Sequence, residues 1–341
     1  MVGLRFRFVT LACFVLMLGA AYSAFASPQK ESITYSAIWI PKFKADWYTR
    51  LETGLMRTGS TLRINVTQVL PSPPLANSQA QLVGDAINQR YGAIFIAPVD
   101  PASVAPALSQ AFKKGIVTIT HQSPHQENAD WDIEMVDAKS FGELAADEMS
   151  TAVQEATGTA PAGEYAVFVG SYTAADHNTW ADAAIQHVKE RYPGLKIVGE
   201  RFAVSEDVGL SRQTALDLLA AYPGIKAFLS FGSQGGPGAA LAVREKGLVG
   251  KVTVIGTTGP EQAAPYLKDG SLSASVVWDP AEAGSLMAYV ARLVLDAKAG
   301  MITPDMDVPG LGKPFSVSGN TITYNRPVVL TGANVGTYAG F

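Results

Sequence analysis

The sequence predicts an α/β protein made of two Rossmann-like, doubly wound lobes joined by hinge crossings. Short β-rich runs alternate with segments of helical periodicity, a pattern that gives right-handed strand–helix–strand units and parallel sheets. The β-rich runs fall into two blocks of five. Two lobes fit this number better than one sheet, because open twisted sheets seldom exceed about ten strands.

The first block has strand-like runs at 33–40, 63–70, 93–97, 117–120 and 133–136, with helical stretches expected at 48–56, 77–89, 104–114 and 141–155. The second block has strands at 165–169, 196–203, 227–231, 252–256 and 273–278, with helices at 179–191, 209–221, 238–246, 260–268 and 280–298. Runs such as "AIFIA" and "YAVFV" are apolar on both faces, as expected of central strands covered by helices on two sides.

The lobes are expected to be discontinuous in sequence. The first lobe spans 30–137 and the second 138–270. The last strand of the second block and the helix after it look like a sixth unit of the first lobe, which adds about 271–305 to it. The Pro/Gly-rich stretch 303–314 predicts a return crossing, so that about 315–341 closes the second lobe.

The N-terminus has the pattern of a cleaved signal peptide over residues 1–26. Arg5 and Arg7 form a basic region, an apolar run follows from 8 to 22, and Ala24-Phe25-Ala26 is a small-x-small cleavage site. A membrane anchor is the alternative, since the uncharged segment is nearly long enough to cross a bilayer. The cleavage site favours export, and the expected location is the periplasm.

Charge and cysteine usage exclude several classes of function. Removing residues 1–26 removes two arginines and no acid, which leaves 24 basic and 30 acidic residues. A net negative chain argues against nucleic acid or an anionic membrane surface as the main partner. The single cysteine, Cys13, lies in the signal peptide, so the mature chain has no disulfide, thiol nucleophile or thiolate metal site.

Ligands of open α/β sheets bind beyond the carboxyl ends of the strands, and the loops there are the candidate site. The first such loop reads "IPKFKADWY". Lys42 is a long donor for ligand oxygens, and Trp47 and Tyr48 offer flat faces to a sugar ring. The alternative is an ordinary first helical turn, with aromatics in the core and lysines in solvent.

The loop after the strand at 117–120 contains Gln122 as a candidate hydrogen-bonding residue. His121 and His125 are four residues apart, which would suit a metal on a helix. Pro124 and the preceding strand indicate a loop instead, and the pattern has no third ligand. No metal site is therefore expected.

Four polar or aromatic candidates follow the strand at 165–169: Asp176, His177, Asn178 and Trp180. Adjacent donors and acceptors suit the recognition of a polyol. The alternative is that Asp176 or Asn178 caps the helix at 179–191. The Asp-His pair has no nucleophile beside it and no G-x-S-x-G elbow, so catalysis is not expected.

Two further loops complete the candidate site. The glycine-rich stretch after the strand at 227–231 places Gln234, Pro237 and Ala239 near a helix start, where backbone N–H groups can face a ligand. It matches neither nucleotide-binding motif. Trp278 and Asp279 end the last strand of the second block. Asp279 either accepts from a ligand hydroxyl or caps the next helix.

Taken together, these segments resemble the periplasmic solute-binding proteins of ABC sugar importers of the ribose-binding type. The resemblance covers nearly the whole mature chain and is closest to the autoinducer-2-binding and rhamnose-binding branch. It implies a type I periplasmic binding protein fold. The segments that carry it are "IPK" at 40–42, the run 93–120, "DHNTW" at 176–180, the Pro237-Gly238-Ala239 turn, "VVWDP" at 276–280 and the end segment 328–338.

The resemblance also implies roles for particular residues. Lys42 matches the lysine of the family's cleft, Asp176 and His177 match an Asp-Gln pair, and Pro237 and Ala239 match positions at a helix start. Gln122 stands where the family usually has an aspartate, and Phe231-Gly232 replaces a Pro-Asp pair. These departures favour a less hydroxylated, modified or acidic sugar-like ligand over autoinducer-2 or rhamnose.

The chain is expected to be a periplasmic solute-binding protein that acts as a monomer, binds a small sugar or sugar-like ligand between its lobes and delivers it to an ABC permease in the inner membrane. Carbohydrate transport of this kind needs no cofactor and no catalysis. One alternative is a periplasmic sensor that passes its ligand-bound state to a receptor kinase. Another is an exported hydrolase that uses Asp176 and His177, against which the missing nucleophile argues.

Overall fold

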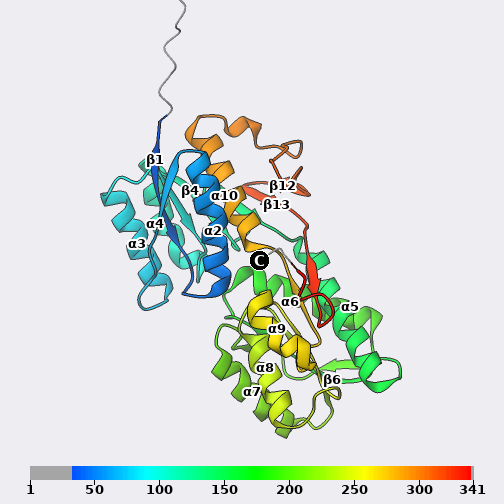
Figure 1. Ribbon diagram of the computed structural model, residues 1–341. Coiled ribbons are helices and arrows are strands. Elements are labelled where there is room, and N and C mark those ends of the chain that lie inside the picture. Colours follow the sequence, from blue (N-terminus) through cyan, green and yellow to red (C-terminus); the bar gives the residue numbers. More distant parts are fainter. Residues whose placement is uncertain (1–32, 339–341) are drawn as a thin grey trace, which may run out of the picture. The chain divides into compact units, whose positions relative to one another are not determined.

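The computed structural model describes residues 33–338 and contains two seven-stranded sheets with helices on their faces (Figure 1). The strand order is β12-β13-β5-β4-β3-β1-β2 in the first sheet and β14-β11-β10-β9-β6-β7 in the second, where β8 also pairs with β6. All pairs are parallel except β12 with β13 and β11 with β14. The expected α/β class with two lobes is confirmed.

The first sheet comprises β1 Tyr35–Ile40, β2 Ile64–Gln68, β3 Ala93–Ile96, β4 Val117–His121, β5 Trp131–Glu134, β12 Ser316–Ser318 and β13 Thr321–Thr323. Helices α2 Asp46–Thr61, α3 Ala76–Asn88 and α4 Pro101–Lys113 connect its strands. In β3 all four residues are fully buried, and they contribute to two separate hydrophobic clusters. This is the signature of a strand covered on both faces.

The second sheet comprises β6 Gly163–Val169, β7 Leu195–Ile197, β8 Phe202–Ala203, β9 Ile225–Ser230, β10 Thr253–Gly256, β11 Ala274–Val277 and β14 Val328–Leu330. Its helices are α5 Ala138–Thr157, α6 Ala175–Arg191, α7 Val208–Ala221, α8 Gly235–Glu245 and α9 Pro260–Asp269. Helix α10 Pro280–Leu295 and the 3-10 turn η1 Ala299–Met301 follow β11.

Helix α10 lies against α2, and glycine makes this approach close (Figure 1). A Cβ on Gly54 would lie 1.9 Å from the backbone oxygen of Ala281, and one on Gly284 would lie 2.1 Å from the backbone oxygen of Leu51. Any side chain at these positions would therefore push the helices apart. The packing holds the first turn of α2, which carries Trp47 and Tyr48.

Two assignments of segments to lobes were wrong. Strand β11 was expected in the first lobe, but it pairs with β10 and β14 of the second sheet. The segment 315–341 was expected in the second lobe, but β12 and β13 extend the first sheet through the pairing of β13 with β5. Within 315–341 only β14 pairs in the second sheet, and the expected strand at 196–203 divides into β7 and β8.

Within residues 33–338 the chain crosses between the sheets three times: between β5 and β6, between β11 and β12, and between β13 and β14. The first and last crossings lie together, because Tyr324 N donates to Glu134 O at 2.7 Å and Arg326 N donates to Met135 O at 3.1 Å. The predicted signal peptide lies outside the described residues. Within 33–338, no helix is both long and apolar enough to cross a membrane.

Candidate functional site

Loops after strands of both sheets meet around a small cavity of about 20 Å³, called the central cavity here. From the first lobe it is lined by Phe43, Trp47, Tyr48 and Gln122, and from the second by His177, Trp180, Glu206, Gly232, Ser233, Thr257 and Trp278. Six of the residues proposed from the sequence are in this lining. The convergence follows from topology, since the carboxyl ends of parallel strands lie at one edge of a sheet.

The first-lobe wall begins directly after β1. Lys42 is only 3% exposed, and Trp47 and Tyr48 lie in the first turn of α2 with 8% and 4% exposure. Trp47 and Tyr48 therefore pack into the core and also line the central cavity. The alternative of solvated lysines is wrong for Lys42. Burying an ammonium group is costly unless another group compensates its charge.

Gln122 lies at the end of β4 in a left-handed backbone conformation, with φ of 60°. A non-glycine residue in this region is strained, and such strain is concentrated at functional sites. Tyr48 Oη donates a hydrogen bond to Gln122 Oε1 at 3.3 Å. The neighbouring His121 is fully buried and places its Nδ1 2.6 Å from the carbonyl oxygen of Ile133.

The second-lobe wall is the first turn of α6. This helix begins at Ala175, so Asp176, His177 and Asn178 lie within it and not in a loop. Its N-cap is Ala174, which makes no side-chain cap, so the interpretation of Asp176 as a cap is wrong. The positive end of a helix stabilises a negative charge in its first turn, which is where Asp176 lies.

Lys42, Asp176 and His177 form a buried polar chain between the lobes. Lys42 Nζ lies 4.0 Å from Asp176 Oδ1, and His177 Nε2 lies 4.0 Å from Asp176 Oδ2. The N–H of Gly170 donates to His177 Nδ1 at 3.1 Å, so a neutral His177 carries its proton on Nε2, toward Asp176. Neither oxygen of Asp176 accepts a hydrogen bond from any described residue.

Burial controls protonation around the cavity. It lowers the pKa of His177 to about 4 and that of His121 to about 4, so both imidazoles are neutral near pH 7. His121 donates from Nδ1, which leaves its buried Nε2 as an acceptor without a partner among the described residues. Burial raises the pKa of Glu206 to about 7, although Lys42 opposes this shift.

Aromatic rings enclose the cavity on its apolar side. Trp278 packs edge-on against Trp47 with centroids 4.9 Å apart and against Trp180 at 5.3 Å. Phe141 contacts Trp180 at 4.9 Å and Trp278 at 5.4 Å. Flat ring faces beside hydrogen-bonding groups suit a ligand with one apolar and one polar side.

Other proposed residues have structural roles. Asn178 Nδ2 donates to the carbonyl oxygens of Ser171 and Ala174. Asp279 caps α10 by accepting from Ala281 N at 2.8 Å and pairs with Arg50 at 2.8 Å, which supports the capping interpretation. Gln234 forms hydrogen bonds with Ser233 and Gln262. Pro237 and Ala239 are buried in the first two turns of α8, and neither lines the central cavity.

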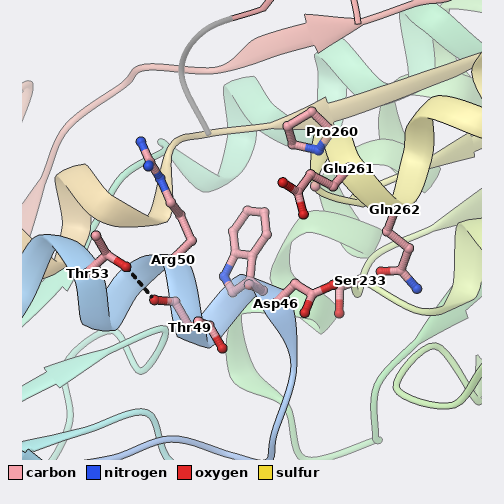
Figure 2. A pocket seen from close by; sticks show the side chains of 10 residues that line it. Asp46, Thr49, Arg50, Thr53, Ser233, Pro260, Glu261 and Gln262 are labelled. Carbon is pink, nitrogen blue, oxygen red and sulfur yellow. Dashed lines mark hydrogen bonds between the residues drawn. The ribbon is translucent and has the colours of Figure 1, made fainter. Parts of the chain in front are cut away.

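A larger cavity of about 260 Å³, called the outer cavity, adjoins the central one at Trp47 and Ser233. Figure 2 shows Arg50 of α2 on one side of it and Glu261 and Gln262 of α9 on the other. Arg50 belongs to the ion pair with Asp279. The outer cavity is therefore a polar vestibule beside the aromatic wall.

A third cavity of about 190 Å³, called the side cavity, has Trp180 in common with the central one. Glu134 and Asp176 line it together with hydroxyl groups of β12 and β13. Glu134 and its neighbour Asp132 were not among the residues proposed from the sequence. The signal was the polar–apolar–polar run Asp132-Ile133-Glu134, which contrasts with the wholly apolar strand β3 of the same sheet.

The described residues contain no group of three histidine, cysteine, aspartate or glutamate side chains arranged to hold a metal ion. Two α/β lobes that join their strand ends around a polar, aromatic-walled cavity define a two-lobed solute-binding protein. Residues 37–299 match the periplasmic binding protein domain, and the chain belongs to that family.

Similar proteins agree with this class. The D-allose-binding periplasmic protein of Escherichia coli (strain K12) is 26% identical over 281 residues, which cover 79% of this chain and 86% of that protein. LsrB from Clostridium saccharobutylicum in complex with AI-2 superposes with a TM-score of 0.81 at 20% identity, over 89% of this chain and 99% of that one.

A solute-binding protein of an ABC transporter from Clostridium phytofermentas with bound L-rhamnose also has a TM-score of 0.81, at 21% identity over 90% of this chain and 99% of that one. These proteins are solute-binding proteins and not enzymes, in agreement with the expectation from the sequence. At such identities the solved structures establish the fold alone.

Proposed function

We propose that this protein is the solute-binding component of an ABC importer, that it binds one small sugar or sugar-like ligand as a monomer, and that it delivers the ligand to a permease in the inner membrane. The observation that carries the proposal is Asp176, a buried carboxylate between Lys42 and His177 whose two oxygens accept no hydrogen bond from the described residues. Buried polar groups are normally hydrogen-bonded, so a ligand with several hydroxyl groups is the expected partner. The D-allose-binding relative supports this class of ligand.

Binding requires the walls of the central cavity to separate. A cavity of about 20 Å³ has room for about one water molecule. The backbone passes between the lobes at 135–137 before α5, at 278–279 before α10 and at 324–327 before β14, and short segments of this kind can absorb backbone rotation in hinge closure. We therefore expect a ligand to enter an open form and to be enclosed when the lobes close.

The test is binding of sugars, polyols, sugar acids and autoinducer-2 to residues 27–341, measured by thermal shift and calorimetry. A ligand at about a hundred times its dissociation constant adds about 2.7 kcal/mol to the free energy of unfolding, which shifts the melting temperature by several degrees. Lys42→Ala and Asp176→Ala should each weaken binding by at least about thirtyfold, because each leaves a buried charge unpaired.

Lys139→Ala and Asp217→Ala remove exposed residues of the same types and serve as matched controls. They should leave the affinity within about twofold of the wild type, since surface substitutions usually have small effects. A protein that binds no member of the panel, after removal of co-purified ligand, would contradict the proposed function.

A further inference from the structure

One face of the first sheet is polar across three neighbouring strands. Thr323 pairs with Glu134 and Thr321 pairs with Asp132 in the register of β13 against β5. Ser316 and Ser318 of β12 lie opposite Thr323 and Thr321 in turn. Side chains alternate between the two faces along a strand. Ile133 and Ile322, which lie between the paired polar residues, therefore point to the opposite face and are buried in the core.

This face borders the side cavity, whose charged lining is acidic. Glu134, Asp137 and Asp176 line it, and none of its lining residues is a lysine or arginine. Asp137 is engaged, because it caps α5 by accepting from Ser140 N at 2.9 Å. Glu134 is 6% exposed and Asp176 2%, and neither Glu134 Oε1 nor the oxygens of Asp176 accept a hydrogen bond from the described residues.

Acidic groups outnumber basic groups around Asp176, between the central and the side cavity. Lys42, 4.0 Å from Asp176, is the cation paired with it in a region that also holds Asp132 and Glu134. Asp132 accepts from Thr120 Oγ1 at 2.7 Å, and hydrogen bonds with Ser123 and Glu134 also act on its carboxyl group. An acidic ligand would add another negative charge here, which weighs against the acidic sugar considered from the sequence.

An ammonium group fits these acceptors better than a hydroxyl group does. It has three N–H donors and no acceptor, whereas each hydroxyl also brings lone pairs that need donors. Its bonds to carboxylates are charge-assisted and about twice as strong as neutral ones. Glu134 and Asp176 supply the carboxylates, and the hydroxyls of Thr321 and Thr323 lie in the same wall.

We propose that the ligand is an amino sugar or a similarly aminated polyol, whose ammonium group binds between Glu134 and Asp176 at the side cavity. This proposal rests on the proposed function and specifies the ligand class of the same site. The ring of the ligand would lie against Trp180, which borders both the central and the side cavity.

Binding of an ammonium group should also change the protonation state of Glu134. Burial, the charges of Asp132 and Asp176 and a hydrogen bond with Asp132 raise the pKa of Glu134 well above its usual value, and Lys42 opposes the shift. Asp137 and His125 are the other titratable groups that line the side cavity. A bound ammonium stabilises the ionised form of Glu134, so binding should release a proton.

The test measures calorimetric affinities of residues 27–341 for three matched pairs: D-glucosamine and D-glucose, D-galactosamine and D-galactose, and D-mannosamine and D-mannose. At least one amino sugar should bind about tenfold more tightly than its neutral partner, as expected for charge-assisted bonds. Its binding heat should also depend on the ionisation enthalpy of the buffer.

Glu134→Gln should abolish both the preference and the proton release, whereas Glu155→Gln, at an exposed position on α5, should preserve them. Neutral sugars that bind as tightly as their amino partners would overturn this inference and leave the proposed function standing. A preference that persists in Glu134→Gln would overturn the assignment of the ammonium site. Failure of all six sugars to bind, together with a positive result for another class in the wider panel, would also overturn the inference.

Discussion

Strands β3 and β5 lie in the same sheet, separated by β4, and both are buried, but their sequences have opposite characters. In β3 the run Ala93-Ile94-Phe95-Ile96 is apolar on both faces and has no exposed side chain. In β5, Ile133 enters the core while Asp132 and Glu134 are buried on the other face. Burial of β3 stabilises the fold, whereas burial of carboxyl groups on β5 costs stability.

The comparison separates residues that hold the fold together from residues that prepare a site. A buried carboxyl group without a hydrogen-bonding partner is rarely kept for packing alone. The acidic face of β5 therefore points to a ligand that supplies the missing partner, and variants of the two strands should move stability in opposite directions.

The largest expected effect is on the apolar strand. Phe95→Ala should lower the free energy of unfolding by about 3–5 kcal/mol, because it removes a fully buried ring and leaves a cavity. Urea unfolding monitored by circular dichroism measures the change. A loss below about 1 kcal/mol would show that β3 does not anchor the first lobe as its burial indicates.

A smaller effect is expected from the buried imidazole of the second-lobe wall. The pKa of His177 is about 4 in the folded protein and about 6.5 when exposed, so the unfolded chain binds more protons between these values. The wild type should therefore lose stability relative to His177→Gln as the pH falls from about 6.5 to 4. The full difference is about 3 kcal/mol at 1.36 kcal/mol per pH unit.

Urea unfolding of both proteins at several pH values measures this difference. At pH 7 and above it should be constant, since both states of His177 are then neutral. Parallel stability profiles below pH 6.5 would mean that His177 is not buried in its neutral form.

The smallest expected effect is an increase in stability, opposite in sign to the loss expected for Phe95→Ala. Glu134→Met should raise the free energy of unfolding of the ligand-free protein by about 1–2 kcal/mol, because it removes a buried carboxyl group whose Oε1 accepts no hydrogen bond from the described residues and keeps a side chain of similar length. Glu155→Met, at an exposed position, should change stability by less than about 0.5 kcal/mol. Destabilisation by Glu134→Met would indicate that this carboxyl group is satisfied without a ligand.

The repeating pattern of strands and helices could be read from the sequence because hydrophobic periodicity is a local property. It located the ends of β1, β4, β6 and β11, and with them Trp47, Gln122, His177 and Trp278 around the central cavity. It could not distinguish a loop from a helical first turn at Asp176, since α6 begins without a side-chain cap. It also missed Glu206, which follows the two-residue strand β8.

What the sequence determined by itself was therefore the α/β class, the two-lobed organisation and the strand ends at which a ligand site forms. Only the tertiary structure decided which sheet β11 joins. It also decided that β12 and β13 return to the edge of the first sheet. Strands of three residues have too little periodicity to reveal their partners. The acidic side cavity depends on that return, because the pairing of β13 with β5 brings Thr321 and Thr323 beside Asp132 and Glu134, residues far apart in the chain.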